Sequence, residues 1–275
     1  MNEPTLDLNT TKGLNQRSRT LKTQAIILRS FDDGEADRTV IILTPEVGKL
    51  KARVRGARKI NSRLGGHTDL LNLTNLNVGL GNHLNVVTAA DSLNSFVNLK
   101  SNLERLAIAI YLAELMNALI PEGVPHRSIF WLLLNALEEL NKNKDPLIIS
   151  RYLELKALEE TGYKQELYRC VLCNTNIQPN QHSYVPSFGG VVCSECTVNP
   201  SELCTLSLNS LKVLRHFDRN RLSDALSIHL DNHIEYEIEK ILEQSIIWIL
   251  EKQSKARKFV THLQNLRKNT AGLIS

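Results

Sequence analysis

The chain has 275 residues, of which 42% are hydrophobic and 23% charged, and its formal net charge is +4. This composition excludes general disorder, and the length allows two or three packed units. The apolar run at residues 246–250 is far shorter than the roughly 20 residues that a membrane span needs. Residues 1–23 lack the apolar stretch of a secretory signal. We therefore expect no membrane segment and a cytoplasmic protein.

The excess of positive over negative charge lies in the first part of the chain. Residues 1–99 hold 13 Lys and Arg against 9 Asp and Glu, whereas residues 100–275 hold 20 of each. The first 23 residues show no apolar periodicity, and we predict that they form a flexible N-terminal arm.

Residues 24–95 have the pattern of a small all-β unit. Short apolar or alternating runs are separated by turn-forming residues such as Asp32-Asp33-Gly34 and Gly79-Leu80-Gly81. The runs lie at residues 25–28, 39–43, 50–54, 70–78 and 84–87. Five strands at this spacing predict a small closed barrel.

Beyond Asp91 the apolar period becomes helical. Helices are predicted to start after Ser101 and to cover residues 128–140, and Asp145-Pro146 has the form of a helix start that continues to Gly162. Two more are predicted at residues 207–217 and 223–252. We therefore predict helical regions over residues 96–167 and 201–275.

Four of the five cysteines form two C-x-x-C pairs. Cys170 and Cys173 are followed, after nineteen residues, by Cys193 and Cys196, which is the spacing of a four-cysteine zinc site. Four thiolates leave no open position for a reacting water, so a single structural Zn²⁺ is the expected role. An iron–sulfur centre, a redox dithiol or plain buried cysteines are the alternatives. Cys204 lies outside both pairs and is expected to be a buried apolar residue.

A run of basic residues follows Val47. Residues 47–68 contain seven Lys or Arg and no Asp or Glu. On a strand, side chains alternate between faces, so Leu50, Ala52 and Val54 should face the barrel interior. The outward face would then carry Lys49, Lys51, Arg53 and Arg55, and the next loop would add Arg58, Lys59 and Arg63. A cationic face without carboxylates favours a polyanion such as nucleic acid over a merely solvated surface.

Aromatic residues are scarce in this region. Phe31 and Phe96 are the only ones in residues 1–99, which leaves little material for a base-stacking platform. We therefore predict binding through phosphate contacts, with weak sequence dependence and steep salt dependence.

Several segments resemble the RecO family of bacterial DNA repair proteins, in an order and spacing that run from about Gln24 to Cys196. They are AIILR at 25–29, GEADR at 34–38, LTPEVGK at 43–49, RGAR at 55–58, SR at 62–63, YLAEL at 111–115, GY at 162–163 and the paired cysteines around Gly189-Gly190. The resemblance implies an α+β protein with an N-terminal OB-fold at residues 24–95. It also implies a helical domain, at residues 96–167 and 201–275, with an inserted zinc-binding module at residues 168–200.

The resemblance also implies a function. A RecO-type protein is a non-enzymatic, nucleoid-associated recombination mediator. It binds single- and double-stranded DNA, anneals complementary strands and works with RecR and the single-strand-binding protein SSB to load RecA recombinase. No catalytic residue and no small-molecule substrate are expected. The implied DNA surface is Arg38, Lys49, Lys51, Arg53, Arg55, Arg58, Lys59 and Arg63, and the implied zinc ligands are Cys170, Cys173, Cys193 and Cys196.

Two other functions fit the same residues. One is an RNA-binding protein built from an OB-fold and a zinc ribbon, and the other is a zinc-stabilised adaptor for protein partners whose basic face is incidental. Binding to DNA and RNA at two salt concentrations, together with an annealing assay, would separate the three.

Overall fold

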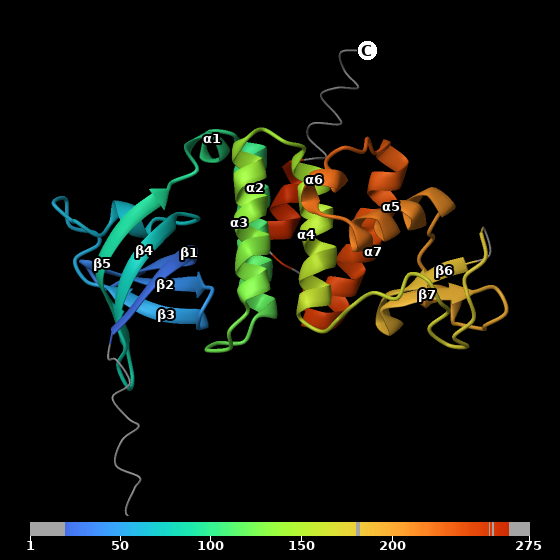
Figure 1. The fold of residues 1–275 in the computed structure, drawn as a ribbon, viewed down its shortest axis with the longest axis horizontal. Coiled ribbons are helices and arrows are strands. Elements are labelled where there is room, and N and C mark those ends of the chain that lie inside the picture. The colour runs from blue at the N-terminus through green and yellow to red at the C-terminus, as the bar shows by residue number, and fades with distance from the viewer. Residues whose placement is uncertain (1–19, 180–181, 253, 255, 264–275) are drawn as a thin grey trace, which may run out of the picture.

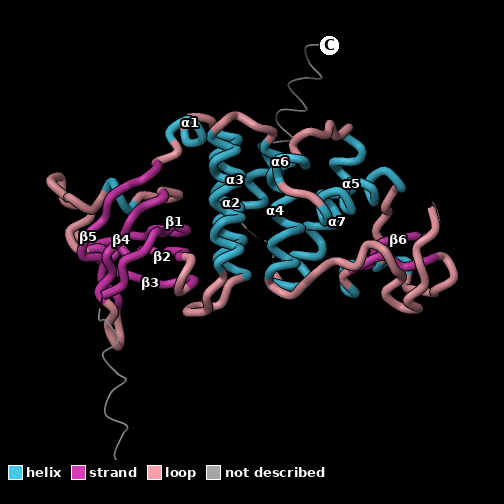
Figure 2. Tube along the Cα trace, viewed as in Figure 1, coloured by secondary structure: helices cyan, strands magenta, loops and turns pink. Residues whose placement is uncertain are grey.

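The computed structural model describes residues 20–179, 182–252, 254 and 256–263. A β-barrel lies at one end, a group of helices in the middle, and a small two-stranded module at the other end (Figure 1). Figure 2 shows the same division, with strands at the two ends and helices between them. Of the arm predicted for residues 1–23, residues 1–19 lie outside the described part.

The barrel is closed and five-stranded, as predicted. Its strand order is β1-β2-β3-β5-β4, with β3 and β5 parallel and the other neighbours antiparallel. The strands are β1 (Thr20–Asp33), β2 (Asp37–Thr44), β3 (Gly48–Val54), β4 (Leu73–Gly79) and β5 (Asn85–Asn94). A short 3₁₀ helix, η1 (Gly66–Thr68), precedes β4.

Two strands extend beyond the predicted runs. β1 begins at Thr20, so the last four residues assigned to the arm belong to the barrel, where Thr20 pairs with Gly79 and Leu21 with Val78. β5 continues to Asn94, seven residues past the predicted end. Both extensions pair with β4 through the backbone. Their few apolar residues, such as Leu21 and Ala90, are interspersed with polar ones and form no apolar run in the sequence.

The barrel has two buried sides. Ala25, Ile27 and Ala52 belong to its interior, whereas Ile26 and Leu28 join the core of the helical region. β1 therefore reads as a continuous apolar run because both of its faces are covered. The same contact explains Gly48, where a Cβ would lie 1.8 Å from the carbonyl oxygen of Val124.

The helical region contains seven labelled α-helices and one further helical segment at residues 256–263 within the described part of the chain. The labelled helices are α1 (Val97–Lys100), α2 (Leu103–Leu119), α3 (Arg127–Asn141), α4 (Pro146–Glu160), α5 (Leu208–Arg219), α6 (Leu222–Ala225) and α7 (Asn232–Leu250). The predicted start at Asp145-Pro146 is confirmed, since the Asp145 carboxylate accepts hydrogen bonds from the amides of Leu147 and Ile148.

The single helix predicted for residues 223–252 is wrong. It is divided into α6 and α7, because the Asp231 carboxylate accepts hydrogen bonds from the amides of His233 and Ile234 and starts a new helix there. Residues 256–263, which follow α7 in the chain, are also helical.

Charged side chains are buried where this last segment meets α4. Arg151 and Glu154 have no exposed side-chain surface, and an Arg151 nitrogen lies 2.7 Å from a Glu154 oxygen. Arg257 reaches the other Glu154 oxygen at 3.4 Å and Glu239 at 2.5 Å, and its guanidinium lies 5.2 Å from the ring centre of Tyr111. This network links residues that are distant in the sequence.

The two-stranded module joins the helices through its inner face. Strands β6 (His182–Val185) and β7 (Gly190–Cys193) are antiparallel, with the 3₁₀ helices η2 (Pro186–Phe188) between them and η3 (Pro200–Glu202) after them. Tyr184 is buried, and its hydroxyl is hydrogen-bonded to Gln165 and lies 3.0 Å from the Ser245 hydroxyl on α7.

Candidate nucleic-acid interface and metal centre

Strand β3 carries most of the predicted basic face, and its side chains alternate as expected. Ala52 and Val54 are buried in the barrel interior, and Leu50 packs against the same core while partly exposed. Lys51 lies on the opposite face and is exposed, and Arg55 is exposed in the turn that follows the strand, one residue past the end of β3. The strand therefore directs its cations outward because every second side chain is apolar and faces the barrel interior.

Lys49 lies at the contact between the barrel and the helical region. Its Nζ donates a hydrogen bond of 2.6 Å to the backbone oxygen of Asn117 on α2. Burial lowers the pKa of Lys49, although the negative charge of Glu122 opposes that effect. Lys49, the first of the four cations predicted on the outward face of the strand, is therefore engaged in a contact between the barrel and α2.

Arg53 is ion-paired, so the expectation of a face without carboxylates is wrong at this position. Its Nε donates to an Asp33 oxygen at 2.8 Å and lies 3.7 Å from Asp37. The hydrogen bond from Arg53, followed by one from Thr39, lowers the pKa of Asp33. The acids lie outside residues 47–68, but the β1–β2 hairpin places them beside the end of β3.

Two further members of the predicted set also meet acids. Arg38 lies 2.9 Å from Asp69, and Arg58 lies 3.3 Å from Asp32. The remaining cations are exposed, and none has an ion pair with any residue that the structure describes. We call these the exposed basic set: Lys51, Arg55, Lys59 and Arg63.

The predicted surface left out Arg29, which lies on the same face of the barrel as Lys51. Arg29 on β1 pairs with Ile41 on β2, and Ile41 pairs with Lys51 on β3. Because paired residues point to the same face of a sheet, Arg29 and Lys51 share a face. Arg29 is exposed and lies 6.0 Å from the ring centre of Phe31, which is 38% exposed. Phe96, the other aromatic residue of this region, is fully buried. Alternation along β1 was the available signal, but a bulge after Ile27 shifts it.

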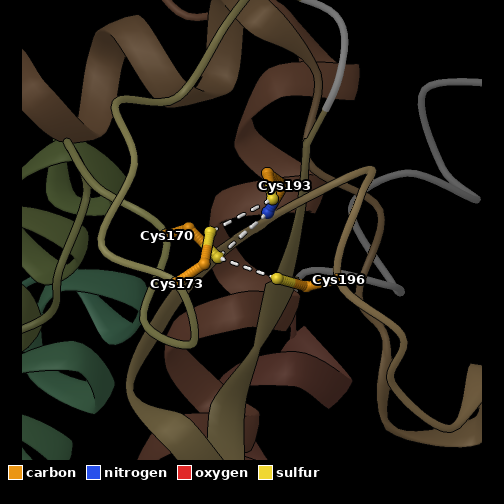
Figure 3. A group of neighbouring side chains, drawn as sticks. All are labelled: Cys170, Cys173, Cys193 and Cys196. Carbon is orange, nitrogen blue, oxygen red and sulfur yellow. Dashed lines mark hydrogen bonds between the residues drawn. The ribbon is translucent and has the colours of Figure 1, made fainter.

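The four paired cysteines form one cluster at the far end of the molecule. Their sulfur atoms all lie within 4.8 Å of one another. Cys170 and Cys196 are 3.8 Å apart and Cys173 and Cys193 are 3.6 Å apart, and all are free thiols (Figure 3). Tetrahedral Zn²⁺ with bonds of about 2.3 Å would place its sulfur ligands about 3.8 Å apart. The geometry therefore fits a four-thiolate metal site.

Local backbone structure holds the sulfurs in place. The amide of Asn174, a residue with φ of 60°, donates to the Cys170 oxygen at 2.8 Å and closes the first turn. The β6–β7 hairpin brings the second pair alongside, where the Cys193 amide donates to the Cys170 sulfur at 3.4 Å.

The pKa values of two thiols in the cluster are shifted in opposite directions. Burial raises the pKa of Cys170, but backbone amides of Cys193, Cys173 and Leu172 outweigh it and lower that pKa to about 6. The hydrogen bond with Cys173 raises the pKa of Cys196 to about 12, because thiolates crowd one another.

Cys204 is buried as predicted, apart from the cluster, and its thiol donates to Gln244 at 2.7 Å.

Two protein-family models together match most of the chain. The model of the N-terminal domain of recombination protein O matches residues 18–96, and the model of its C-terminal domain matches residues 100–258. The chain belongs to the RecO family of DNA repair proteins. The C-terminal match extends the similarity well beyond Cys196, where the sequence resemblance ended.

Individual RecO proteins are similar over most of their length. The DNA repair protein RecO of Dehalococcoides mccartyi is 34% identical over 235 residues, covering 86% of this chain and 92% of that protein. The Roseiflexus RecO is 32% identical over 255 residues, covering 93% and 90%, and that of Symbiobacterium thermophilum is 31% identical over 245 residues, covering 88% and 96%. Across the described part of this RecO-family chain, no helix is both long and apolar enough to cross a bilayer.

Proposed function

We propose that the protein is a recombination mediator that binds single- and double-stranded DNA on its barrel and anneals complementary strands. In this proposal it works with RecR and helps to load RecA onto DNA coated by SSB. It acts in the cytoplasm at the nucleoid, without catalysing a chemical reaction and without a small-molecule substrate. Membership of the RecO family of DNA repair proteins supports this role.

The observation that carries the proposal is the exposed basic set on and after β3. Lys51 lies on the strand, Arg55 lies in the turn directly after it, and Lys59 and Arg63 continue the charge into the loop. Because no described carboxylate pairs with them, they can neutralise phosphates without first breaking an ion pair. Arg29, on the same face as Lys51, adds a fifth exposed cation.

The cations that form ion pairs with carboxylates contribute less to DNA binding in this proposal. Arg38, Arg53 and Arg58 remain candidates for phosphate contact, but each must leave a carboxylate or share it with a phosphate. Lys49 would act at the border of the surface, where its ammonium group is already bound by α2. We therefore expect the exposed basic set to provide most of the electrostatic affinity.

Annealing follows from the kind of contact that this surface makes. Two complementary strands repel each other through their phosphates, and a cationic surface reduces that repulsion. Phe31 is the one partly exposed aromatic residue in the described part of the barrel, so most bases would stay unstacked from protein and free to pair. The surface would hold a strand by its backbone and leave its base edges accessible.

We propose that the four cysteines bind one structural Zn²⁺. A tetrahedral site filled by four thiolates has no position for a substrate or an activated water, so the metal would stabilise the module alone. The module packs through Tyr184 and Val191 on the helical core, and its stability therefore contributes to that of the whole C-terminal part.

The test is an annealing assay on complementary DNA strands, bare and coated with SSB, in the presence and absence of RecR. The proposal predicts faster annealing of bare strands by the protein alone and faster RecA loading on coated strands when RecR is present. Binding to single-stranded DNA, duplex DNA and RNA of one length is measured alongside at two salt concentrations.

Matched variants connect the assay to the surface. Lys51→Gln combined with Arg55→Gln should slow annealing and weaken binding together, while metal content stays unchanged. A strong preference for RNA would favour an RNA-binding OB-fold protein instead. No binding to any nucleic acid would favour the adaptor for protein partners.

A further inference from the structure

The loop between β3 and η1 has an apolar residue at its tip. Ile60 has a relative exposure of 103%, the highest among the large apolar side chains that the structure describes; the next is Val97 at 70%. Single exposed apolar residues are common and by themselves carry no meaning. The surroundings of Ile60 are what give this one significance.

The loop is built to hold its tip in a defined position. At its first end, the Gly56 amide donates to Asp37 at 2.8 Å and the Arg58 amide donates to the Ala36 oxygen at 3.0 Å. At its other end, the Ser62 hydroxyl accepts hydrogen bonds from the amides of Leu64 and Gly65.

Packing fixes the two ends further. Ala57 is buried, and Leu64 packs on the barrel interior. Gly65 is required where the two ends meet, since a Cβ there would lie 2.4 Å from the Ala57 oxygen. Between these anchors the amide of Ser62 donates to the Lys59 oxygen at 2.9 Å, which turns the chain at Ile60. The apolar side chain is therefore held outward by an ordered loop.

Charge identifies the ligand that such a tip would meet. Arg58 and Lys59 precede Ile60 and Arg63 follows it, while residues 56–66 contain no acid. Lys59 and Arg63 have no ion pair with a described residue. A protein groove that takes up Ile60 would have to be acidic around an apolar pocket, whereas DNA offers phosphates beside the apolar faces of stacked bases. Proteins that bend DNA use isoleucine in this way, as a wedge between base steps.

We propose that Ile60 is a wedge that inserts between neighbouring bases of DNA whose phosphates are held by Lys59 and Arg63. The loop then unstacks one base step at the edge of the barrel surface. This inference rests on the proposed DNA-binding function and adds a contact to bases that the cations alone do not make.

The test uses DNA duplexes and single strands that carry one 2-aminopurine, placed at different positions, since its fluorescence rises when the base is unstacked. The full-length protein should increase the fluorescence on binding. Ile60→Ser should lose most of that increase while its affinity changes by less than about tenfold, because the phosphate contacts are kept. Ile60→Leu should restore the increase.

Val97→Ser is the matched control, since it removes an exposed apolar side chain from α1, outside the barrel surface. It should behave like the original protein. An unchanged fluorescence increase with Ile60→Ser would overturn the wedge, and so would loss of RecR association by that variant with its DNA signal intact. If the unaltered protein binds no DNA, the proposed function fails as well; if only Ile60→Ser is without effect, the proposed function stands and the wedge is rejected.

Discussion

Neutralising three cations of the exposed basic set should change the salt dependence of DNA binding by a calculable amount. The variant combines Lys51→Gln, Arg55→Gln and Arg63→Gln, and none of these side chains has an ion pair within the described structure. If each contacts one phosphate of single-stranded DNA, the negative slope of log K against log salt becomes shallower by about 0.7 per lost contact, or about 2 in total. Affinity would then be about 100-fold lower at 0.1 M salt and approach that of the original protein near 1 M.

The assay is fluorescence anisotropy with a labelled oligonucleotide over a series of salt concentrations. The control variant removes the same charge from exposed positions in the helical region, with Arg127→Gln, Lys212→Gln and Arg221→Gln. Both variants should unfold at nearly the same temperature as the original protein, because exposed substitutions seldom change stability by more than about 0.5 kcal/mol. Equal slopes for the two variants would refute the assignment of phosphate binding to the barrel.

Three further predictions concern single residues. Asp33→Asn should release Arg53 and increase DNA affinity and salt slope in the same titration; a decrease would show that the ion pair positions Arg53 for binding. Cys173→Ser should abolish stoichiometric metal in elemental analysis and lower the unfolding temperature, with little change in DNA affinity; unchanged metal content would contradict the four-thiolate site. Glu154→Gln should destabilise the protein by about 3–5 kcal/mol in urea unfolding, because the buried Arg151 loses its nearest carboxylate and keeps only Glu239, at 3.8 Å; a cost below about 1 kcal/mol would show that the network is not needed.

Local signals in the sequence were sufficient for much of the fold. Cap and turn chemistry act over a few residues, so the helix that starts after Asp145 could be placed from the sequence. Two C-x-x-C turns at the right separation likewise predicted the cysteine cluster, because each turn fixes two thiols and a hairpin has only to join them. Alternation along β3 correctly separated Ala52 and Val54 from Lys51, whereas Arg55, which was expected on the same strand face, lies in the turn after the strand.

The failures involve partners brought together by the fold. Arg53 and Asp33 are twenty residues apart and meet through the pairing of three strands, so a charge count over residues 47–68 could not include Asp33. Lys49 contacts Asn117 across 68 residues, at a contact whose existence depends on barrel docking. The division between α6 and α7 could have been seen, since Asp231 is a strong capping residue within an otherwise periodic stretch.

Site-specific photo-cross-linking tests the central claim most directly, that DNA is held on the basic side of the barrel. A photoreactive residue is introduced at Asn61, beside the exposed basic set, and in a second protein at Tyr236, which is 58% exposed on α7. The account predicts cross-links to single-stranded DNA from position 61 that disappear at high salt, and few from position 236. Cross-links from position 236 with none from position 61 would contradict it.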